Sequence, residues 1–282
     1  MRLLSIVIFF LYMYSYAFIT VKEGICNDKG KEMSRIDICQ ENFRTLFNSE
    51  ALTPIGNDPE FMAILQKYIF GEIFTVGELD IKVREMLTIV SLVTQQTLPQ
   101  LKAHLNAGLN VGITPIELRE VIYQCAPSIG FPKTLNALSV MNEVLEEQGI
   151  ALPLESTSTV NEQTRFEKGF AIQSKMYGSE VDNMLQGLPH NIDKELSRYI
   201  TEFYFGDFYT REGLSVELRE LLVISILVTT GHIEILKNHI QGNLRIGNSA
   251  ETIVAAIIQC SPYVGFPNTI EALKVLKEVI TE

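Results

Sequence analysis

Cysteine is scarce in this chain: four of its 282 residues are cysteine, and tryptophan is absent. Four cysteines are too few for a disulfide scaffold, and a chain of this length can bury a sizeable hydrophobic core without one. Basic residues are also in deficit, with 23 Lys and Arg against 34 Asp and Glu, for a net charge of -11. This balance argues against nucleic acid as a partner and against electrostatic binding to an anionic membrane.

Several catalytic signatures are also missing from the sequence. It contains no Cys-x-x-Cys, no glycine-rich phosphate loop and no Gly-x-Ser-x-Gly. Its four histidines show no metal-ligand pair of standard spacing, so we expect no metal site. The hydrophobic content of 46%, by contrast, excludes wholesale disorder. The sequence therefore predicts a folded globular chain.

The first segment of the chain has the pattern of a secretory signal. A positive residue precedes an apolar run over residues 3–14, and small residues stand at Ser15 and Ala17, the two positions that a signal peptidase reads. We expect residues 1–17 to be cleaved, which predicts a secreted or periplasmic protein. The alternative is an uncleaved segment that anchors the chain in a membrane. No second apolar run is long and uncharged enough to span a membrane.

A polar leader over residues 18–50 is expected to follow the signal. Cys26 and Cys39 lie close together in this leader. Export implies an oxidising compartment, in which these two cysteines are candidates for a disulfide. The alternative is that both remain free thiols.

The rest of the chain is a tandem duplication of one unit. From Phe70 onwards the sequence matches itself without a gap at a shift of 205 − 70 = 135 residues, the second copy beginning at Phe205. A period of this length is typical of a duplicated domain. Residues 151–159, rich in Ser, Thr and Pro, have the composition of a linker. We therefore expect a first domain over residues 51–150 and a second over residues 160–282.

Each copy is expected to consist of helices, so the predicted fold class is all-α. Helices are predicted to begin after Asp58, after the N-cap residues Asp80 and Ser215, and at a capping box formed by Thr114 and Glu117. The helix after Asp80 carries apolar residues round most of its circumference, which predicts a central buried helix. Further helices are expected over residues 98–109, 114–127, 131–147 and 192–205, and an additional one over residues 165–185, with a shortened counterpart over residues 36–52.

Three polar features recur in both copies where the helical pattern predicts core. The first is an Arg-Glu pair in the central helix, Arg84-Glu85 and Arg219-Glu220. A buried charge must be paired or must face a cavity. The arginine is therefore either a clamp for a substrate carboxylate, beside an orienting glutamate, or half of an ion pair that ties helices together.

The second feature is a histidine, His104 or His239, at the edge of the apolar stripe of the next helix. Histidine transfers protons near neutral pH, although a core histidine bonded to a carbonyl group is the alternative. The third feature is a cysteine, Cys125 or Cys260, near the C-terminus of a helix, where the helix dipole disfavours a thiolate. We expect these two cysteines to be buried packing residues rather than nucleophiles.

Taken together, these residues resemble the carboxymuconolactone decarboxylase family. The shared pattern runs from Arg-Glu-Leu-Leu in a buried helix through Leu-Lys-x-His and Thr-x-x-Glu to a Gly-Phe-Pro turn, which begins here at Gly130 and Gly265. The resemblance covers most of both repeats and implies two tandem helical-bundle domains with the alkylhydroperoxidase D-like fold. It also implies that single-domain relatives form rings of dimers, so this duplicated chain is expected to be a homo-oligomer, a trimer.

One branch of this family consists of thiol peroxidases that resemble alkylhydroperoxidase D. Their pattern is a glutamate, then Cys-x-x-Cys, then a histidine, and both copies have the glutamate and the histidine. Other residues occupy the two cysteine positions, namely Thr97 and Gln100 in the first copy and His232 and Ile235 in the second. A sulfenate and disulfide cycle needs thiols, so a peroxidase would have to recruit Cys125 or Cys260.

The other branch, which resembles the lactone decarboxylases, needs a group that holds a carboxylate and an acid that protonates the remaining carbon. The resemblance implies these roles, in the order clamp, acid and orienting residue, for Arg84, His104 and Glu85 in the first copy and for Arg219, His239 and Glu220 in the second. Tyr263, which stands where the first copy has Ser128, is expected to bind substrate and slightly favours the second copy.

We therefore predict a cofactor-independent decarboxylase that acts on a small carboxylated lactone or a related organic acid. A peroxidase-type antioxidant is the first alternative. A non-catalytic binding or structural protein is the second.

Overall fold

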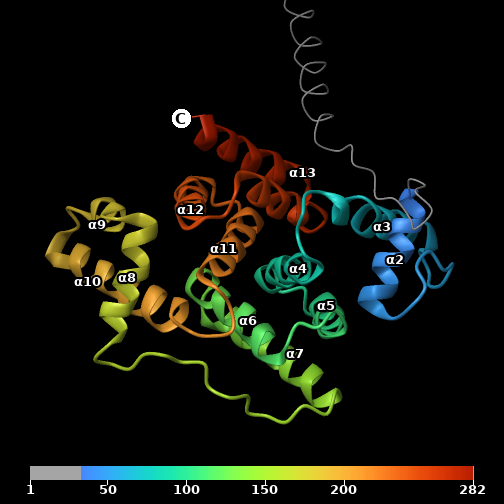
Figure 1. Cartoon of the computed structure of the whole chain (residues 1–282), viewed down its shortest axis with the longest axis horizontal. Coiled ribbons are helices and arrows are strands. Elements are labelled where there is room, and N and C mark those ends of the chain that lie inside the picture. The colour runs from blue at the N-terminus through green and yellow to red at the C-terminus, as the bar shows by residue number, and fades with distance from the viewer. Residues whose placement is uncertain (1–32, 282) are drawn as a thin grey trace, which may run out of the picture. The chain divides into compact units, whose positions relative to one another are not determined.

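The computed structural model describes residues 33–281, and every regular element in that range is a helix (Figure 1), as predicted. The expected signal peptide and Cys26 lie outside the described residues. Export, membrane anchoring and the Cys26–Cys39 disulfide therefore stay predictions.

The described residues form two compact units, and the smaller one comprises residues 33–44 and 50–76. It contains most of α2 (Arg35–Phe47), together with α3 (Pro59–Gly71) and the short η1 (Ile73–Thr75). The two long helices approach closely because Gly71 has no side chain: a Cβ at this position would lie 2.5 Å from the carbonyl oxygen of Arg35. Cys39 is fully buried in α2 and has no disulfide partner among the described residues.

The larger unit comprises residues 45–49 and the chain from Gly77 onwards, and holds the cores of both repeats. The first repeat contributes α4 (Ile81–Gln95), α5 (Leu98–Asn110), α6 (Pro115–Ile129) and α7 (Phe131–Glu147). The second contributes α8 (Arg165–Tyr177), α9 (Glu180–Leu185), η2 (Pro189–Asn191), α10 (Ile192–Tyr199), the π-helical η3 (Ile200–Tyr209), α11 (Val216–Thr230), α12 (Ile233–Ile246) and α13 (Ala250–Thr281).

The predicted helix starts are confirmed by their capping bonds. The side chain of Asp80 accepts a hydrogen bond from the backbone of α4, that of Ser215 does the same for α11, and both bonds of the Thr114–Glu117 capping box are present. The predicted end of α6 at Pro127 is wrong, because the helix continues to Ile129. Proline removes one N–H donor, but the next turn still closes through a bond from Gly130 N–H to the carbonyl group of residue 126.

Helix α13 is the second-repeat equivalent of α6 and α7 joined end to end. Its backbone breaks at Gly265, with φ 78° and ψ 164°, and Gly130 between α6 and α7 has nearly the same values, φ 83° and ψ 160°. By length and composition α13 is the one described helix that could cross a membrane, which corrects the expectation that no second run is long and apolar enough. Helices of a protein core pass the same test, and 44% of its apolar window is buried inside the protein.

The helix predicted over residues 165–185 is two helices, because the chain turns at Gly178 with φ 53°. The first repeat has the shortened counterpart that was expected: α2 has 13 residues, as α8 has, but the segment 165–185 also contains α9. The difference lies after them, since no helix in the described chain between α2 and α3 corresponds to α9.

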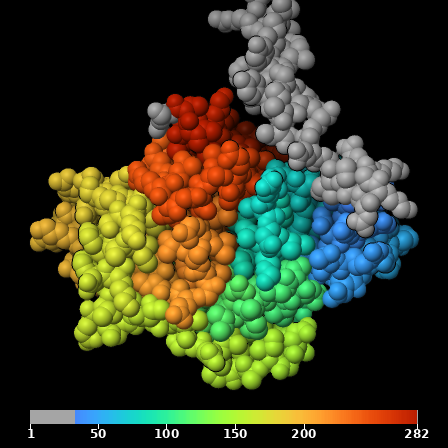
Figure 2. Space-filling model, viewed as in Figure 1, coloured from blue at the N-terminus to red at the C-terminus, as the bar shows by residue number. Residues whose placement is uncertain are grey.

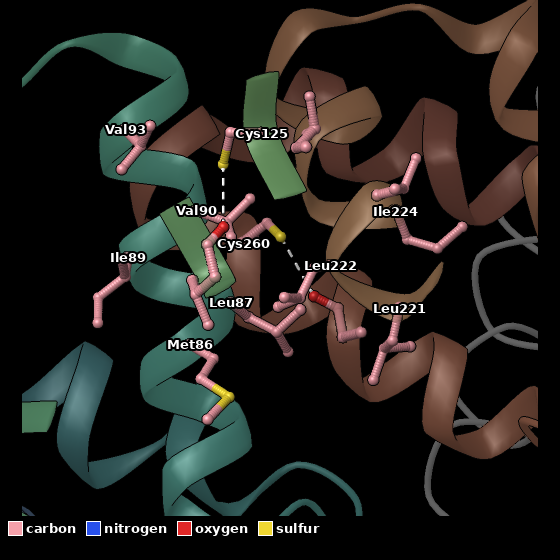
Figure 3. Packing of buried hydrophobic residues seen from close by; sticks show 14 of the residues in the cluster. Met86, Leu87, Ile89, Val90, Val93, Cys125, Leu221, Leu222, Ile224 and Cys260 are labelled. Carbon is pink, nitrogen blue, oxygen red and sulfur yellow. Dashed lines mark hydrogen bonds between the residues drawn. The ribbon is translucent and has the colours of Figure 1, made fainter. Parts of the chain in front are cut away.

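The two repeats share one hydrophobic core. Helix α4 of the first repeat packs directly against α11 and α13 of the second, and the surfaces of α6 and α11 adjoin in Figure 2. Buried side chains from both repeats belong to a single cluster, which includes Leu87 and Val90 of α4 and Leu222 and Ile224 of α11 (Figure 3). The sequence duplication therefore does not produce two separately packed cores.

Candidate functional site

The two arginines predicted as carboxylate clamps lie buried where the repeats meet. Arg84 Nη1 donates to Gln259 Oε1 at 3.2 Å, and Arg219 Nη1 donates to Gln124 Oε1 at the same distance. Arg84 also donates to two backbone carbonyl groups of the loop before α4. Each arginine thus binds the glutamine of the other repeat. This geometry favours the second interpretation of the arginines, as residues that tie helices together.

Arg219 is part of a buried ionic cluster. Its guanidinium group donates to Glu120 Oε2 at 3.0 Å, and the same carboxylate accepts from Arg211 at 2.9 Å and from Thr157 of the linker. Burial acts to raise the pKa of Glu120, but the bonds from Arg211 and Thr157 and the charges of Arg211 and Arg219 together outweigh it, so the pKa is lowered. Burial lowers the pKa of Arg219, and it lowers that of Arg84 to about 10.

The glutamate and the histidine of each repeat form a pair, as predicted. Glu85 Oε1 lies 2.5 Å from His104 Nδ1, and Glu220 Oε1 lies 2.6 Å from His239 Nδ1. Both carboxylates are fully buried. A carboxylate at Nδ1 fixes the orientation of an imidazole ring and leaves Nε2 for a ligand.

Two tyrosines that the sequence analysis missed complete the second pair. Tyr177, the last residue of α8, donates to Glu220 Oε1, and Tyr209, the last residue of η3, donates to Glu220 Oε2 at 2.5 Å. The Tyr177 hydroxyl group also lies 2.8 Å from His239 Nδ1. Burial, reinforced by the charge of Glu220, raises the pKa of both tyrosines. They therefore remain protonated donors, and Glu220 is the acceptor.

The first repeat has phenylalanine in place of Tyr177. Phe47, the last residue of α2, meets the His104 ring edge to face with centroids 5.6 Å apart, and Tyr177 meets His239 in the same way at 5.6 Å. The ring is therefore preserved and the hydroxyl group is lost.

The residue that matches Tyr209 at the 135-residue shift is Phe74, so the second hydroxyl group is lost from the first repeat as well. Glu85 Oε2 is buried without a hydrogen-bond partner among the described residues. The carboxylate of the first pair is therefore less fully bonded than Glu220.

Further differences between the copies follow from Tyr177. A Cβ at Gly242 would lie 2.9 Å from the Tyr177 hydroxyl oxygen, so the ring requires glycine there, whereas the first repeat has Ala107 at this position. Arg245 donates to the carbonyl oxygen of Met176 at 2.7 Å and so holds the end of α8 in place.

His239 lies at the wall of a cavity of about 160 Å³ in the second repeat. An engineered apolar cavity of about 150 Å³ accepts benzene, so this one has room for a small ring. Its lining is mostly apolar and comes from α8, α9, η3 and α12: Tyr177, Glu180, Val181, Met184, Ile200, Tyr204, Phe205, Ile235, Asn238 and His239. Neither predicted clamp, Arg84 or Arg219, belongs to this lining.

Tyr263 lies beside the first pair and not beside the second, to which the sequence analysis assigned it. Its ring centroid is 6.2 Å from that of His104, and its hydroxyl group accepts a hydrogen bond from Thr88 Oγ1 at 3.2 Å. The reason is that α13 packs on α4, so the turn in α13 reaches the other repeat. Ser128, its first-repeat match, correspondingly bonds Tyr204 at the second site.

Cys125 and Cys260 are buried packing residues, as predicted, with 0% and 1% of their surfaces exposed. They lie among apolar side chains of both repeats (Figure 3), where Cys125 donates to a backbone carbonyl group and Cys260 donates to Ser225 Oγ. Burial raises the pKa of Cys125, and it raises that of Cys260 to about 11. Neither is poised to be a thiolate. Among residues 33–281 no cluster of metal-ligating side chains is found.

Comparison with known proteins finds the same family in each repeat. Residues 59–143 and 194–278 both match the carboxymuconolactone decarboxylase family. The 4-carboxymuconolactone decarboxylase of Acinetobacter baylyi is 24% identical over 124 residues, which are 44% of this chain and 92% of that protein. Nitrosuccinic acid decarboxylase of Metarhizium robertsii is 27% identical over 118 residues, 42% of this chain and 82% of that protein. An uncharacterised 15.0 kDa protein of Paracoccus denitrificans is 33% identical over 92 residues, 32% of this chain and 69% of that protein.

Proposed function

The chain belongs to the carboxymuconolactone decarboxylase family, and on this basis we propose that its second repeat is a decarboxylase-like enzyme for a small organic acid. The observation that carries the proposal is the group of Tyr177, Glu220 and His239 at the wall of an apolar cavity. Two of these relatives are named as decarboxylases, which supports the class of reaction and leaves the substrate open.

The proposed chemistry is a redox-neutral exchange of carbon dioxide for a proton. The bond between the substrate carboxyl carbon and its neighbouring carbon breaks, and its electron pair moves into an adjacent carbonyl group of the substrate. His239, protonated and held by Glu220 through Nδ1, supplies the proton from Nε2 and is reprotonated from water. The carboxylate of Glu220 stabilises the imidazolium form, and Tyr177 and Tyr209 hold that carboxylate in position.

We propose that the first repeat has a structural role. The His104 ring packs against both Phe47 and Tyr263, and the two tyrosine hydroxyl groups of the second site have no counterpart at the matching positions. Its central helix meanwhile supplies much of the shared core. In this proposal the second repeat catalyses the reaction and the first repeat stabilises the fold.

The proposal is tested by a screen of the purified protein for carbon dioxide release from carboxylated lactones and small oxo acids. We expect saturable release from at least one acid, in protein freed of cofactors and metals by dialysis against a chelator. A parallel assay follows peroxide consumption with a thiol reductant. Peroxide consumption without release of carbon dioxide would replace the proposal with the peroxidase alternative. Inactivity in both assays would favour a binding or structural protein.

Replacing both core cysteines separates the two catalytic alternatives. In the Cys125→Ala, Cys260→Ala variant we expect unchanged turnover of the acid, because neither thiol lies at the His239 cavity. The free energy of unfolding should fall by about 1 to 2 kcal/mol, because each change removes a buried atom from a packed core. Chemical denaturation and initial rates measure the two effects. Loss of peroxide consumption in a variant that remains folded would favour the peroxidase.

We also propose that the protein is secreted or periplasmic, with an uncleaved membrane anchor as the alternative, and that the duplicated chain assembles as a trimer. N-terminal sequencing of the protein from its host tests the first point. The mass of the assembly in solution tests the second.

A further inference from the structure

We infer that the cavity at His239 takes a small monocarboxylic acid with an apolar body, and discriminates against dicarboxylic acids. This inference rests on the proposed function in one respect, that the ligand carries the carboxylate to be removed. It goes beyond the proposed function because it specifies the charge and the polarity of the substrate.

The charges at the cavity wall match one carboxylate and not two. His239 is the one lining residue that becomes a cation on protonation. The other ionised lining residue is Glu180, whose negative charge opposes a second carboxylate. Arg245 pairs with Glu180 at 2.7 Å and also donates to the backbone of α8, so its charge is already matched. A second ligand carboxylate would therefore be desolvated without a partner, which is unfavourable.

The arginine that the sequence offers for a second carboxylate is unable to reach it. Arg219 is fully buried and does not line the cavity. Its Nη atoms donate to Glu120, Gln124 and backbone carbonyl groups at 3.0 to 3.3 Å, and its Nε is buried without a partner among the described residues. Turning it towards the cavity would break an ion pair inside the protein and leave Glu120 without one of its cations.

The remaining wall favours an apolar body. Val181, Met184, Ile200 and Ile235 contribute aliphatic side chains, and Phe205 contributes a ring. Burying the apolar surface of a ligand against these groups stabilises the complex in proportion to the area buried. The volume of about 160 Å³ limits this body to about the size of a five- or six-membered ring. Loss of the only carboxylate would leave an uncharged product.

The test is isothermal titration calorimetry of the full chain with two unreactive probes, cyclopentanecarboxylate and cyclopentane-1,2-dicarboxylate. Neither probe has a carbonyl group next to its carboxylate-bearing carbon, so binding is measured apart from turnover. We expect the monocarboxylate to bind at least about tenfold more tightly. The cavity-filling variant Val181→Trp should abolish this binding.

The variant Glu180→Gln frees the charge of Arg245, which can then bind the second carboxylate of the dicarboxylate. The ratio of the two probes' dissociation constants should therefore fall by about tenfold. Glu180 is 41% exposed, so the substitution leaves the fold intact. The matched control is Glu147→Gln, which removes the exposed pair with Lys102 at 2.6 Å on the first repeat and should change neither affinity.

Tighter or equal binding of the dicarboxylate by the unmodified protein overturns the inference, and so does the absence of binding by either probe. Binding of the monocarboxylate that survives in Val181→Trp also overturns it, since the ligand then lies elsewhere. Preferred binding of the monocarboxylate, without carbon dioxide release from any acid in the screen, supports the inference on ligand class while the proposed reaction fails.

Discussion

Tyr177 marks the difference between the two copies at the scale of single residues. Its hydroxyl group bridges Glu220 and His239, whereas Phe47 presents the same ring to His104 without the bridge. The hydroxyl group of Tyr177 stabilises the buried carboxylate by donating a hydrogen bond to it. Hydrogen bonds to an ionised group are about twice as strong as those between neutral groups. The two Glu–His pairs therefore have the same geometry and different chemistry around it.

Replacing Gly242 with alanine should disturb this bridge. The new methyl group would lie 2.9 Å from the Tyr177 hydroxyl oxygen, so the ring must shift away from Glu220. We expect kcat to fall by about tenfold, at the cost of one hydrogen bond to a charged group. Steady-state kinetics with a thermal unfolding control measure the effect.

The same substitution in a Tyr177→Phe background is the matched control. This double variant reproduces the Phe47 and Ala107 combination of the first repeat, and the hydroxyl group, the nearest of the ring's atoms to the new methyl group, is absent. We expect Gly242→Ala to cost much less in that background. Equal losses in both backgrounds would contradict the role assigned to the hydroxyl group.

The Glu–His pairs were predictable because the glutamate and the histidine recur in both copies at the 135-residue shift. Tyr177 and Tyr209 were not predictable as parts of the site. Helices α2 and α8 begin at residues 35 and 165, so they correspond at a shift of 165 − 35 = 130 rather than 135. A gapless comparison therefore never places Phe47 opposite Tyr177. The pair of Phe74 and Tyr209 does fall at the 135-residue shift, but nothing in the sequence showed that a buried carboxylate lies beside that tyrosine.

At the scale of helices, local sequence predicted where elements begin but not what they contact. Caps at Asp80 and Ser215 fixed the starts of the central helices, since capping depends on a few neighbouring residues. The Arg-Glu pair of α4 was also visible in the sequence, but Arg84 bonds Gln259 of α13, 175 residues away along the chain. Periodicity predicts which face of a helix is buried and carries no information on the partner helix.

Glu120→Gln should weaken the contact between helices α6 and α11 in a pH-dependent way. The pKa of Glu120 is lowered in the folded state, so its charge stabilises the fold above the unfolded pKa of about 4.3, and this contribution is lost as the pH falls through the folded value. We expect the variant to lose about 3 kcal/mol of unfolding free energy at pH 7, because Arg219 is left without its carboxylate.

Urea unfolding of both proteins at pH 7 and at about pH 3 measures this difference, which should shrink at the lower pH because the stabilisation from the Glu120 charge declines as the pH falls below the unfolded pKa towards the lowered folded pKa. The exposed Glu147→Gln variant is the control and should change stability by less than about 1 kcal/mol at either pH. A difference that is the same at both pH values would show that Glu120 does not act through its charge.

At the scale of the whole molecule, the duplication in the sequence produces two repeats and one core. The period of 135 residues predicted two domains, because sequence similarity shows the repeated unit and not where its apolar surface is buried. Both central helices are apolar round most of their circumference, and α4 and α11 cover each other within a single cluster. An isolated repeat would therefore expose the face of its central helix that the other repeat buries in the intact chain.

Separated repeats should fail to fold. A fragment of residues 160–282 would expose Leu222 and Ile224, which are fully buried in the intact chain. We expect no cooperative urea transition from this fragment by circular dichroism, and recovery of one when a fragment of residues 18–150 is added. A cooperative transition from either fragment alone would mean that each repeat packs its own core.

The assignment of the reaction to the second repeat is tested most directly by comparing His239→Gln with His104→Gln. Each variant removes one imidazole from the same chain, and the measurement is the initial rate of carbon dioxide release, with thermal unfolding as a check of the fold. We predict that kcat falls at least about 100-fold in His239→Gln and stays within about twofold in His104→Gln, because proton transfer by a positioned histidine contributes at least that much. Equal losses, or the larger loss in His104→Gln, would contradict the account.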